Sequence, residues 1–306
     1  MIRVSVIGLG AMGASYAAKI FDSGCVDVRV IADGDRAQRL RRDGVTVKGK
    51  RYDFTVLTPD DDVEPADLMI VAVKHTALKQ ALPQMTRHMS GNTVVLSLLN
   101  GITSEDEIAA AYPQCHPLLS ITFAIDAVRK EQTINYLSFG RIEFGEKSNT
   151  EPYTEQVRWL ARLFDAAGIS YTVPYDMVRE LWWKFMINVG VNQVTAVIGA
   201  PYCVIQDPKG PAFELMIAAQ REVIAVARAQ GIDLTEADLG TWCEVLAGLG
   251  PQQYTSMAQD VLARRPTEVD IFGGTMRRLG SQFDIAVPVN TCLYQLLKAK
   301  EQTWMI

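Results

Sequence analysis

The chain has 306 residues, more than a single hydrophobic core usually supports, so two domains are expected. Apolar residues make up 48% of the sequence, and no apolar run approaches the ~20 residues that span a membrane. A net charge of -5 argues against a nucleic-acid-binding protein, which would carry a basic excess. With five scattered cysteines and three histidines, no metal site is expected.

The cellular compartment is indicated by two features. The first residues lack the basic segment, apolar stretch and cleavage site of a secretory signal. No C-x-x-C pair occurs among Cys25, Cys115, Cys203, Cys243 and Cys292, which is typical of a reducing environment. We therefore expect a cytoplasmic protein with no membrane or nucleic-acid partner. Oligomeric state stays open, with a homodimer as one candidate.

A glycine-rich motif begins the first predicted βα unit. The apolar-rich run 2–7 leads into Gly8-Leu9-Gly10-Ala11-Met12-Gly13, and an alanine-rich helical stretch follows over 14–21. This is the context that a dinucleotide-binding fingerprint requires. Gly8 allows the tight turn, Gly10 lets the backbone approach a pyrophosphate, and Gly13 lets the helix pack close to the strand. The alternative is a glycine turn without a ligand.

The rest of the first half alternates between strands and helices, which predicts a mainly parallel sheet. Residues 67–73 are nearly all apolar, as in a strand buried on both faces. In chain order we predict a strand over 26–32, a helix over 36–42, a hairpin of 45–47 with 52–57, a strand over 67–73, a helix over 76–89 interrupted by Pro83, strands over 93–99 and 118–124, an antiparallel edge strand over 135–144 around Gly140, a helix over 152–167, and a closing strand over 169–173.

The pattern changes after Pro174, where helical periods replace strand signals. The expected fold is α/β: an N-terminal, doubly wound Rossmann-type domain followed by an all-α C-terminal domain. We place a dinucleotide-binding domain over 1–174 and a helical substrate-binding and catalytic domain over 175–306.

Polar residues follow two of the buried strands. Lys74 comes directly after the strand over 67–73, and Asn100-Gly101 follows the strand over 93–99. In open α/β sheets ligands bind beyond the carboxyl ends of the strands, so both positions are candidates for the junction of cofactor and substrate. The alternative is a solvated lysine and an ordinary turn.

The predicted helix over 177–197 carries a polar face. Lys184, Asn188 and Asn192 are spaced at i, i+4 and i+8, which keeps them within about 80° around a helix. Their neighbours are apolar, and polar groups buried without partners cost several kcal/mol. A polar substrate or an internal polar network would each supply partners. A buried lysine is also a usable general acid, since burial lowers its pKa.

Two polar residues of the last third are further candidates. Ser256 and Glu268 lie in the segments 254–260 and 266–274. A carboxylate just after Pro266 also suits the start of a helix, where the helix dipole favours it. Spacing alone leaves the role of Glu268 open.

Together these blocks resemble the ketopantoate reductases (2-dehydropantoate 2-reductases), over essentially the whole chain. The order of six separate blocks is more specific than any single block. The blocks are Gly8-x-Gly10-x-x-Gly13, Val71-Ala72-Val73-Lys74, Leu99-Asn100-Gly101, Glu180-Leu181-Trp182-Trp183-Lys184 with Asn188 and Asn192, Ser256-Met257-x-Gln259-Asp260, and Thr267-Glu268-Val269-Asp270.

The resemblance implies reduction of 2-dehydropantoate to pantoate, a step of pantothenate biosynthesis. Lys184 matches the general acid of the family, and Glu268 matches the carboxylate on the hydroxyl side of the substrate. Lys74 and Asn100 match residues at the junction of cofactor and substrate. The family also implies that Asn188, Asn192 and Ser256 bind substrate.

Departures from the family concern the substrate and the cofactor. Gln253 and Gly199 stand where asparagines are common, which favours as an alternative a reductase of another branched 2-oxo acid. Asp33 replaces the usual arginine and would bind a free ribose 2′-OH, as in NAD(H). Arg36, with Arg39 and Arg42 behind it, would instead hold the phosphate of NADP(H), the expected cofactor. A non-catalytic dinucleotide sensor would not need both Lys184 and Glu268.

Overall fold

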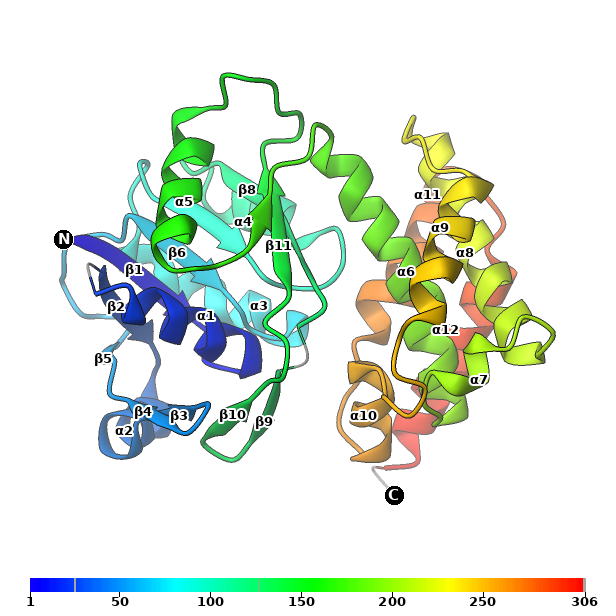
Figure 1. Cartoon of the computed structure of the whole chain (residues 1–306), viewed down its shortest axis with the longest axis horizontal. Helices are drawn as coiled ribbons and strands as arrows, with labels where there is room; N and C mark the ends of the chain where they lie inside the picture. Colours follow the sequence, from blue (N-terminus) through cyan, green and yellow to red (C-terminus); the bar gives the residue numbers. More distant parts are fainter. Residues whose placement is uncertain (25, 126, 305–306) are drawn as a thin grey trace. The chain divides into compact units, whose positions relative to one another are not determined.

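The computed structural model describes residues 1–24, 26–125 and 127–304 (Figure 1). It divides into two compact units, residues 1–178 and 179–306. The first is α/β and the second is helical, which confirms the expected fold class. The change of pattern expected at Pro174 falls a few residues before this division. No helix in the described part of the chain is long and apolar enough to cross a membrane.

The main sheet of unit 1 is doubly wound. Within the described residues its order is β12-β11-β8-β7-β6-β1-β2-β5, and its pairs are parallel except for β8 with β11. The chain adds β2 and β5 on one side of β1 and then β6, β7 and β8 on the other, so strand order reverses between β1 and β6. The strands are β1 (Ile2–Ile7), β2 (Val26–Ile31), β5 (Thr55–Leu57), β6 (Leu68–Val71), β7 (Val94–Ser97), β8 (Pro117–Phe123), β11 (Arg141–Gly145) and β12 (Tyr171–Thr172).

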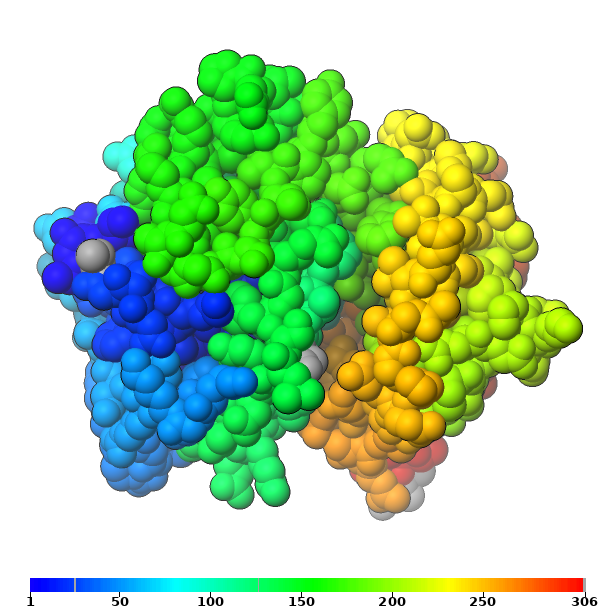
Figure 2. Space-filling view, in the orientation of Figure 1, coloured from blue at the N-terminus to red at the C-terminus, as the bar shows by residue number. Residues whose placement is uncertain are grey.

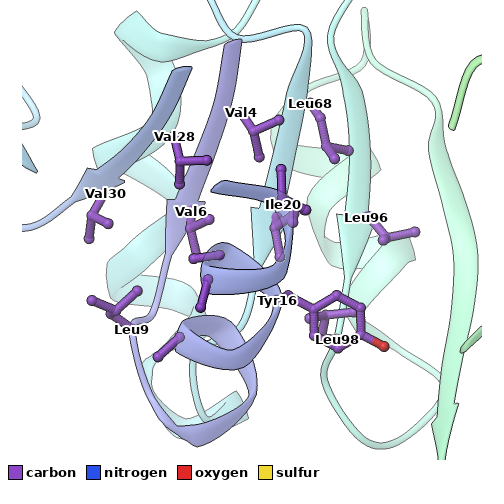
Figure 3. Close-up of a cluster of buried hydrophobic side chains, with 14 of the residues drawn as sticks. Val4, Val6, Leu9, Tyr16, Ile20, Val28, Val30, Leu68, Leu96 and Leu98 are labelled. Atoms are coloured by element: carbon purple, nitrogen blue, oxygen red, sulfur yellow. The ribbon is translucent and has the colours of Figure 1, made fainter. Parts of the chain in front are cut away.

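Helices cover both faces of this sheet. Along β6, Leu68 and Ile70 pack into one apolar cluster and Met69 and Val71 into another, because successive strand residues point to opposite faces. The first cluster holds α1 (Ala11–Asp22) and α5 (Glu155–Ala166), and Figure 3 shows Tyr16 and Ile20 of α1 against the strands. The second holds α3 (His75–Ala81), the 3-10 helix η1 (Leu82–His88) and α4 (Ser104–Ala111).

A second, smaller sheet has the order β4-β3-β10-β9 and corrects two predictions. The hairpin predicted from 45–47 and 52–57 is wrong in its second strand, because β3 pairs with β4 and Thr55–Leu57 joins the main sheet beside β2. The single strand predicted over 135–144 is also wrong. It is split at Gly140, whose φ of 66° breaks an extended strand. The strands are β3 (Val45–Val47), β4 (Lys50–Tyr52), β9 (Val128–Lys130) and β10 (Thr133–Asn135).

Two further helices of unit 1 bear on the site. The first, α2 (Gly34–Asp43), follows β2 directly. The second, α4, was not predicted, since its first turn is the acidic run Glu105-Asp106-Glu107 and its apolar signal is weak. The predicted interruption at Pro83 is confirmed, because α3 gives way there to the 3-10 helix η1.

Unit 2 consists of helices joined by loops, with no strand among its described residues, 179–304. Its central helix α6 is buried along most of its length and ends at Gly199, whose φ is 71°. Lys300 Nζ donates to the carbonyl of Val197 in the last turn of α6, at 2.8 Å. The elements are α6 (Met177–Ile198), α7 (Cys203–Gln206), α8 (Pro211–Ala229), α9 (Glu236–Ala247), α10 (Ser256–Leu262), the π-helical turn η2 (Asp270–Gly274), α11 (Thr275–Gln282) and α12 (Pro288–Gln302).

Candidate functional site

The glycine turn after β1 is shaped by close backbone contacts. A Cβ added at Gly8 would lie 2.5 Å from the carbonyl carbon of Ala72, and one at Gly13 would lie 2.2 Å from the oxygen of Gly8. Gly10 is different, since a Cβ there would meet nothing within 4 Å. Two of the glycines are therefore required by packing, whereas Gly10 leaves open space above its backbone.

The start of α1 fits the pyrophosphate of a dinucleotide. Gly10 is the N-cap, no side chain caps the helix, and no acidic residue lies in its first turn. The first intrahelical bond runs from Ala14 N to Gly10 O, so the N–H groups before it have no acceptor within the helix. Such N–H groups, at the positive end of a helix beside open space, form an anion-binding site.

The predicted cofactor residues of unit 1 lie along one edge of the sheet. The parallel strands β7, β6, β1 and β2 are neighbours, and their carboxyl ends lead to Asn100, Lys74, the glycine turn and Asp33 in that order. Adjacent strands are about 4.8 Å apart, so these four segments lie side by side along the edge of the sheet. The turn itself lies at the β1/β6 switch point, where doubly wound folds bind dinucleotides.

Local contacts fix the acidic end of this edge. Asp33 is exposed, and its Oδ1 accepts from Gly34 N at 2.7 Å, which caps α2. Arg36 lies in the first turn of α2. Its pKa is lowered by burial and by the nearby charges of Arg129 and Arg39. Sequence reasoning missed Arg129, because a hairpin far along the chain carries it and no motif marks it.

At the other end, Lys74 and Asn100 follow the strands β6 and β7. Lys74 is exposed and is the N-cap residue of α3, and Asn100 is half-buried. On the two sides of the Asn100 loop in sequence, the Ser97 and Ser104 hydroxyls are 2.8 Å apart, and Ser104 donates to Glu105 Oε2 at 2.8 Å. Burial raises the pKa of the Glu105 carboxyl to about 7. The two ends of the loop carrying Asn100 are thus hydrogen-bonded to each other and to a buried titratable group.

In unit 2, the polar face predicted on α6 has the expected character. Lys184 is half-buried, and the side chains of Asn188 and Asn192 are buried among apolar neighbours of the same helix. Trp182 belongs to the core, with its ring 5.7 Å from that of Phe185. A lysine and two amides thus lie along a largely buried helix.

Ser256 is held beside the same helix. Thr195 of α6 and Thr255 share a hydroxyl–hydroxyl hydrogen bond of 2.8 Å, and Thr255 also caps α10 by accepting from Ala258 N at 3.1 Å. The Thr195 hydroxyl lies 3.4 Å from the carbonyl of Asn192. Ser256, exposed and first in α10, is therefore fixed near the Asn192 turn of α6.

Glu268 lies in a segment that packs on α6. It is half-buried and comes just before η2. Thr267 is fixed by Glu301 Oε1, which accepts from its N–H at 2.8 Å and its hydroxyl at 2.6 Å. The Phe272 ring of η2 lies 6.4 Å from that of Phe185, next to Lys184 in sequence. A π-helical turn is often found at functional sites, and this one sets the position of Glu268.

A buried amide network between helices was not predicted. Gln193 Nε2 donates to Asn290 Oδ1 at 2.9 Å, and Asn290 Nδ2 donates to Glu222 Oε2 at 2.8 Å. Gln193 follows Asn192 directly, but its amide donates to Asn290 on α12, which in turn donates to Glu222 on α8. The position of an amide on a helix does not by itself show whether it faces another helix or a substrate. That distinction requires knowing where the neighbouring helices lie.

The described residues form no metal centre. Across residues 1–24, 26–125 and 127–304, no three His, Cys, Asp or Glu side chains gather so as to hold a metal ion. Cys115, Cys203, Cys243 and Cys292 are free thiols, and Cys25 lies outside the described residues.

A doubly wound sheet with a glycine turn at its switch point is typical of dinucleotide-binding domains, and here a helical unit with a half-buried lysine among buried amides follows it. Combined with the family matches that follow, this identifies an NAD(P)-dependent oxidoreductase that acts on a ketone or CH–OH group. Comparison with known proteins agrees. The family models "Ketopantoate reductase PanE/ApbA" and "Ketopantoate reductase PanE/ApbA C terminal" match residues 4–149 and 176–301. The chain belongs to the ketopantoate reductase family.

Individual relatives cover nearly the whole chain. The 2-dehydropantoate 2-reductase of Vibrio cholerae is 29% identical over 99% of each chain. A solved D-mandelate dehydrogenase with NADH and anilino(oxo)acetate shares the fold with a TM-score of 0.88 and 22% identity, covering 100% of both chains. A dimeric ketopantoate reductase from Staphylococcus aureus has a TM-score of 0.82 and 19% identity, covering 99% of this chain and 100% of its own.

Proposed function

We propose that this protein is a 2-dehydropantoate 2-reductase that uses NADPH and forms pantoate for pantothenate synthesis. The observation that carries the proposal is the polar face of α6, where Lys184, Asn188 and Asn192 lie at helical spacing among mostly apolar residues. The glycine turn and the start of α1 are the proposed pyrophosphate site. When bound, NADPH supplies the hydride that reduces the ketone carbon.

In the proposed mechanism Lys184 is the general acid. Its ammonium donates a proton to the ketone oxygen as negative charge develops there, and its positive charge stabilises that oxygen. Partial burial strengthens this interaction, because charges interact more strongly away from bulk water.

The remaining site residues orient the reactants. Glu268 accepts a hydrogen bond from the substrate hydroxyl, and Asn188, Asn192 and Ser256 bind the carboxylate and ketone end. In unit 1, Lys74 and Asn100 contact the cofactor and substrate where the two meet. Correct orientation of this kind contributes a large part of the rate in reactions between two bound molecules.

NADPH is proposed over NADH because of Arg36. Its guanidinium lies near the like charges of Arg129 and Arg39 and forms no ion pair with a carboxylate among the described residues, which favours a phosphate ligand. Asp33, whose carboxylate caps α2, favours NADH instead. Replacing Asp33 by Arg should strengthen the preference for NADPH, and an unchanged preference would show that the existing arginines already set it.

A second candidate is a reductase of another 2-oxo acid, favoured by Gln253 and Gly199. Gly199 has a structural explanation, since its positive φ ends α6 and its N–H donates to Thr195 O at 2.8 Å. Asparagine also tolerates this conformation, so the exchange alters the helix end little. Gln253 also has a backbone role, because its carbonyl accepts from Tyr202 N at 2.9 Å.

The test compares 2-dehydropantoate with 3,3-dimethyl-2-oxobutanoate, which lacks only its hydroxyl group. A site that hydrogen-bonds a substrate hydroxyl rejects the analogue without it by roughly 10⁴-fold, and a loss of at least about 10²-fold in kcat/KM is expected here. Phenylglyoxylate, the 2-oxo acid of mandelate, extends the panel. A higher kcat/KM for either analogue would refute the proposed substrate.

A homodimer is part of the same proposal, supported by the dimeric relative from Staphylococcus aureus. Light scattering after size exclusion should give twice the chain mass of 33.8 kDa. A single-chain mass at micromolar concentration would contradict it.

A further inference from the structure

The hairpin of β9 and β10 brings an arginine to the glycine turn. Arg129 Nη1 donates to the carbonyl of Leu9 at 2.6 Å, across 120 residues of sequence. Its Nε donates to Glu131 O at 2.6 Å and its Nη2 to Gln132 Oε1 at 2.9 Å. These three bonds fix the plane of the guanidinium against the turn, while two of its five N–H donors remain for another ligand.

The hairpin is itself anchored next to α2. Its strand β10 pairs with β3, which follows α2 in the chain. Thr46 N donates to Gln132 O at 2.9 Å, and Lys48 N donates to Ile134 O at 3.0 Å. In Figure 1 the hairpin extends beside β3, β4 and α2, and the space-filling view shows the same segments at the surface (Figure 2).

Three arginines of this region, Arg36, Arg39 and Arg129, lie close enough for their charges to influence one another. Both Arg36 and Arg129 are exposed, yet partial desolvation and neighbouring arginine charges lower the pKa of each: Arg129 and Arg39 act on Arg36, and Arg39 acts on Arg129. Among the described residues, none of the three forms an ion pair with a carboxylate. Other arginines nearby do: Arg42 pairs with Asp43 at 2.7 Å and Arg51 with Asp53 at 2.8 Å.

We propose that Arg129 and Arg36 together bind the 2′-phosphate of NADPH, so that Arg129 is a specificity-determining residue of the cofactor site. The inference rests on the NADPH preference of the proposed function. The ribose nearest the adenine lies beyond β2 in this fold, at Asp33, and β2 neighbours the strand that leads into the glycine turn. Arg36 lies in the first turn of the helix that Asp33 caps, and Arg129 lies at the glycine turn. Their guanidinium groups would supply the forked, charged donors that phosphate binds best.

The proposal also assigns the hairpin a function. An arginine on a strand of the main sheet would have to reach across the turn, whereas the short β9–β10 hairpin carries Arg129 directly to Leu9 O. One guanidinium that contacts both the glycine-turn carbonyl and the 2′-phosphate would couple the pyrophosphate site to the site of the 2′-phosphate.

The test is a titration of the full chain with NADPH and with NADH, followed by nicotinamide fluorescence. For Arg129→Gln the Kd for NADPH should rise about tenfold or more, the usual loss for a charge-assisted contact, while the Kd for NADH stays within about twofold. Lys130→Gln is the matched control, since it removes the same charge from the adjacent position of the same strand and should change neither Kd. Equal weakening of both cofactors would overturn the proposal, because it would mean that Arg129 only supports the turn.

Two further variants keep the test decisive if Arg129→Gln folds poorly. Arg129→Lys keeps the charge but loses the fork, so an intermediate, NADPH-selective loss is expected. Arg36→Gln should be selective in the same sense. Tighter binding of NADH than NADPH by the wild-type chain would also overturn the inference. Failure of the proposed reaction is a separate observation: no turnover of 2-dehydropantoate, with selective NADPH binding intact, refutes the substrate and leaves Arg129 in its role.

Discussion

The two units differ in the chemical groups that form their candidate sites: mainly backbone groups in unit 1 and side chains in unit 2. Unit 1 uses backbone at the ends of neighbouring strands, where Gly8, Gly10 and Gly13 shape a turn and the first turn of α1 offers N–H groups. Unit 2 uses side chains on helices, with Lys184 held by α6 and Glu268 held by a segment packed on it. A backbone site fails when a Cβ enters it. A side-chain site fails when one functional group is removed and the fold persists.

The largest expected effect is in unit 2. Lys184→Ala should lower kcat by about 10²–10⁴-fold, the usual contribution of a general acid, with the Kd for NADPH nearly unchanged. Steady-state kinetics and fluorescence titration measure the two quantities. Lys300→Ala, which removes the α12 lysine that donates to the last turn of α6, is the control for helix stability. Turnover within about twofold of wild type in Lys184→Ala would exclude the general-acid role.

In unit 1 the glycines should separate packing from ligand binding. Gly10→Ala places a methyl group in open space at a φ of -78°, so the fold should be unaffected while the Kd for NADPH rises at least about tenfold. Gly13→Ala forces a Cβ onto the oxygen of Gly8 and should lower the melting temperature as well. Thermal unfolding and cofactor titration distinguish the two. Unchanged NADPH binding in Gly10→Ala would place the pyrophosphate elsewhere.

Glu105 gives unit 1 a pH-dependent stability. Its pKa is about 7 in the folded chain and about 4.5 when unfolded, because folding buries the carboxyl. Below pH 4.5 both states hold the proton. Between pH 4.5 and 7 only the folded state holds the proton, so the contribution of Glu105 to stability falls by about 1.4 kcal/mol per pH unit as the pH rises. Urea unfolding of Glu105→Gln should show a stability gain over wild type that grows from pH 5 to 7 and then levels. A pH-independent difference would contradict the burial argument.

The smallest expected effect concerns the cap of α10. Thr255→Ala removes the N-cap and the bond to Thr195, which should cost about 1 kcal/mol and raise the KM for the 2-oxo acid a few fold, because Ser256 loses its support. Thr154→Ala is the matched control, since Thr154 caps α5 in unit 1. It should cost similar stability and leave KM unchanged. Equal KM values in both variants would show that Ser256 does not contribute to substrate binding.

Sequence predicted the main sheet because its signals are local. Buried parallel strands such as Leu68–Val71 are continuous apolar runs, and the glycine motif fixes the first βα unit. The small sheet was misread because pairing, not composition, decides which strand joins which sheet. Thr55–Leu57 and Thr133–Asn135 are too short to show their partners.

The candidate site divides in the same way. Residues at strand ends, such as Lys74 and Asn100, could be predicted from topology alone. Arg129 could not, since its partner Leu9 is 120 residues away in sequence and no motif marks the hairpin that carries Arg129. Nor could the Thr195–Thr255 bond, which depends on how α10 meets α6.

The central claim is that unit 1 holds the cofactor and unit 2 supplies the proton. Its most direct test is the single-turnover rate of ketone reduction at saturating NADPH in Gly10→Ala and Lys184→Ala. We predict that saturation restores the rate of Gly10→Ala to near wild type, whereas Lys184→Ala stays at least about 10²-fold slow. Recovery of Lys184→Ala under saturation, or a persistent defect of that size in Gly10→Ala, would contradict this division.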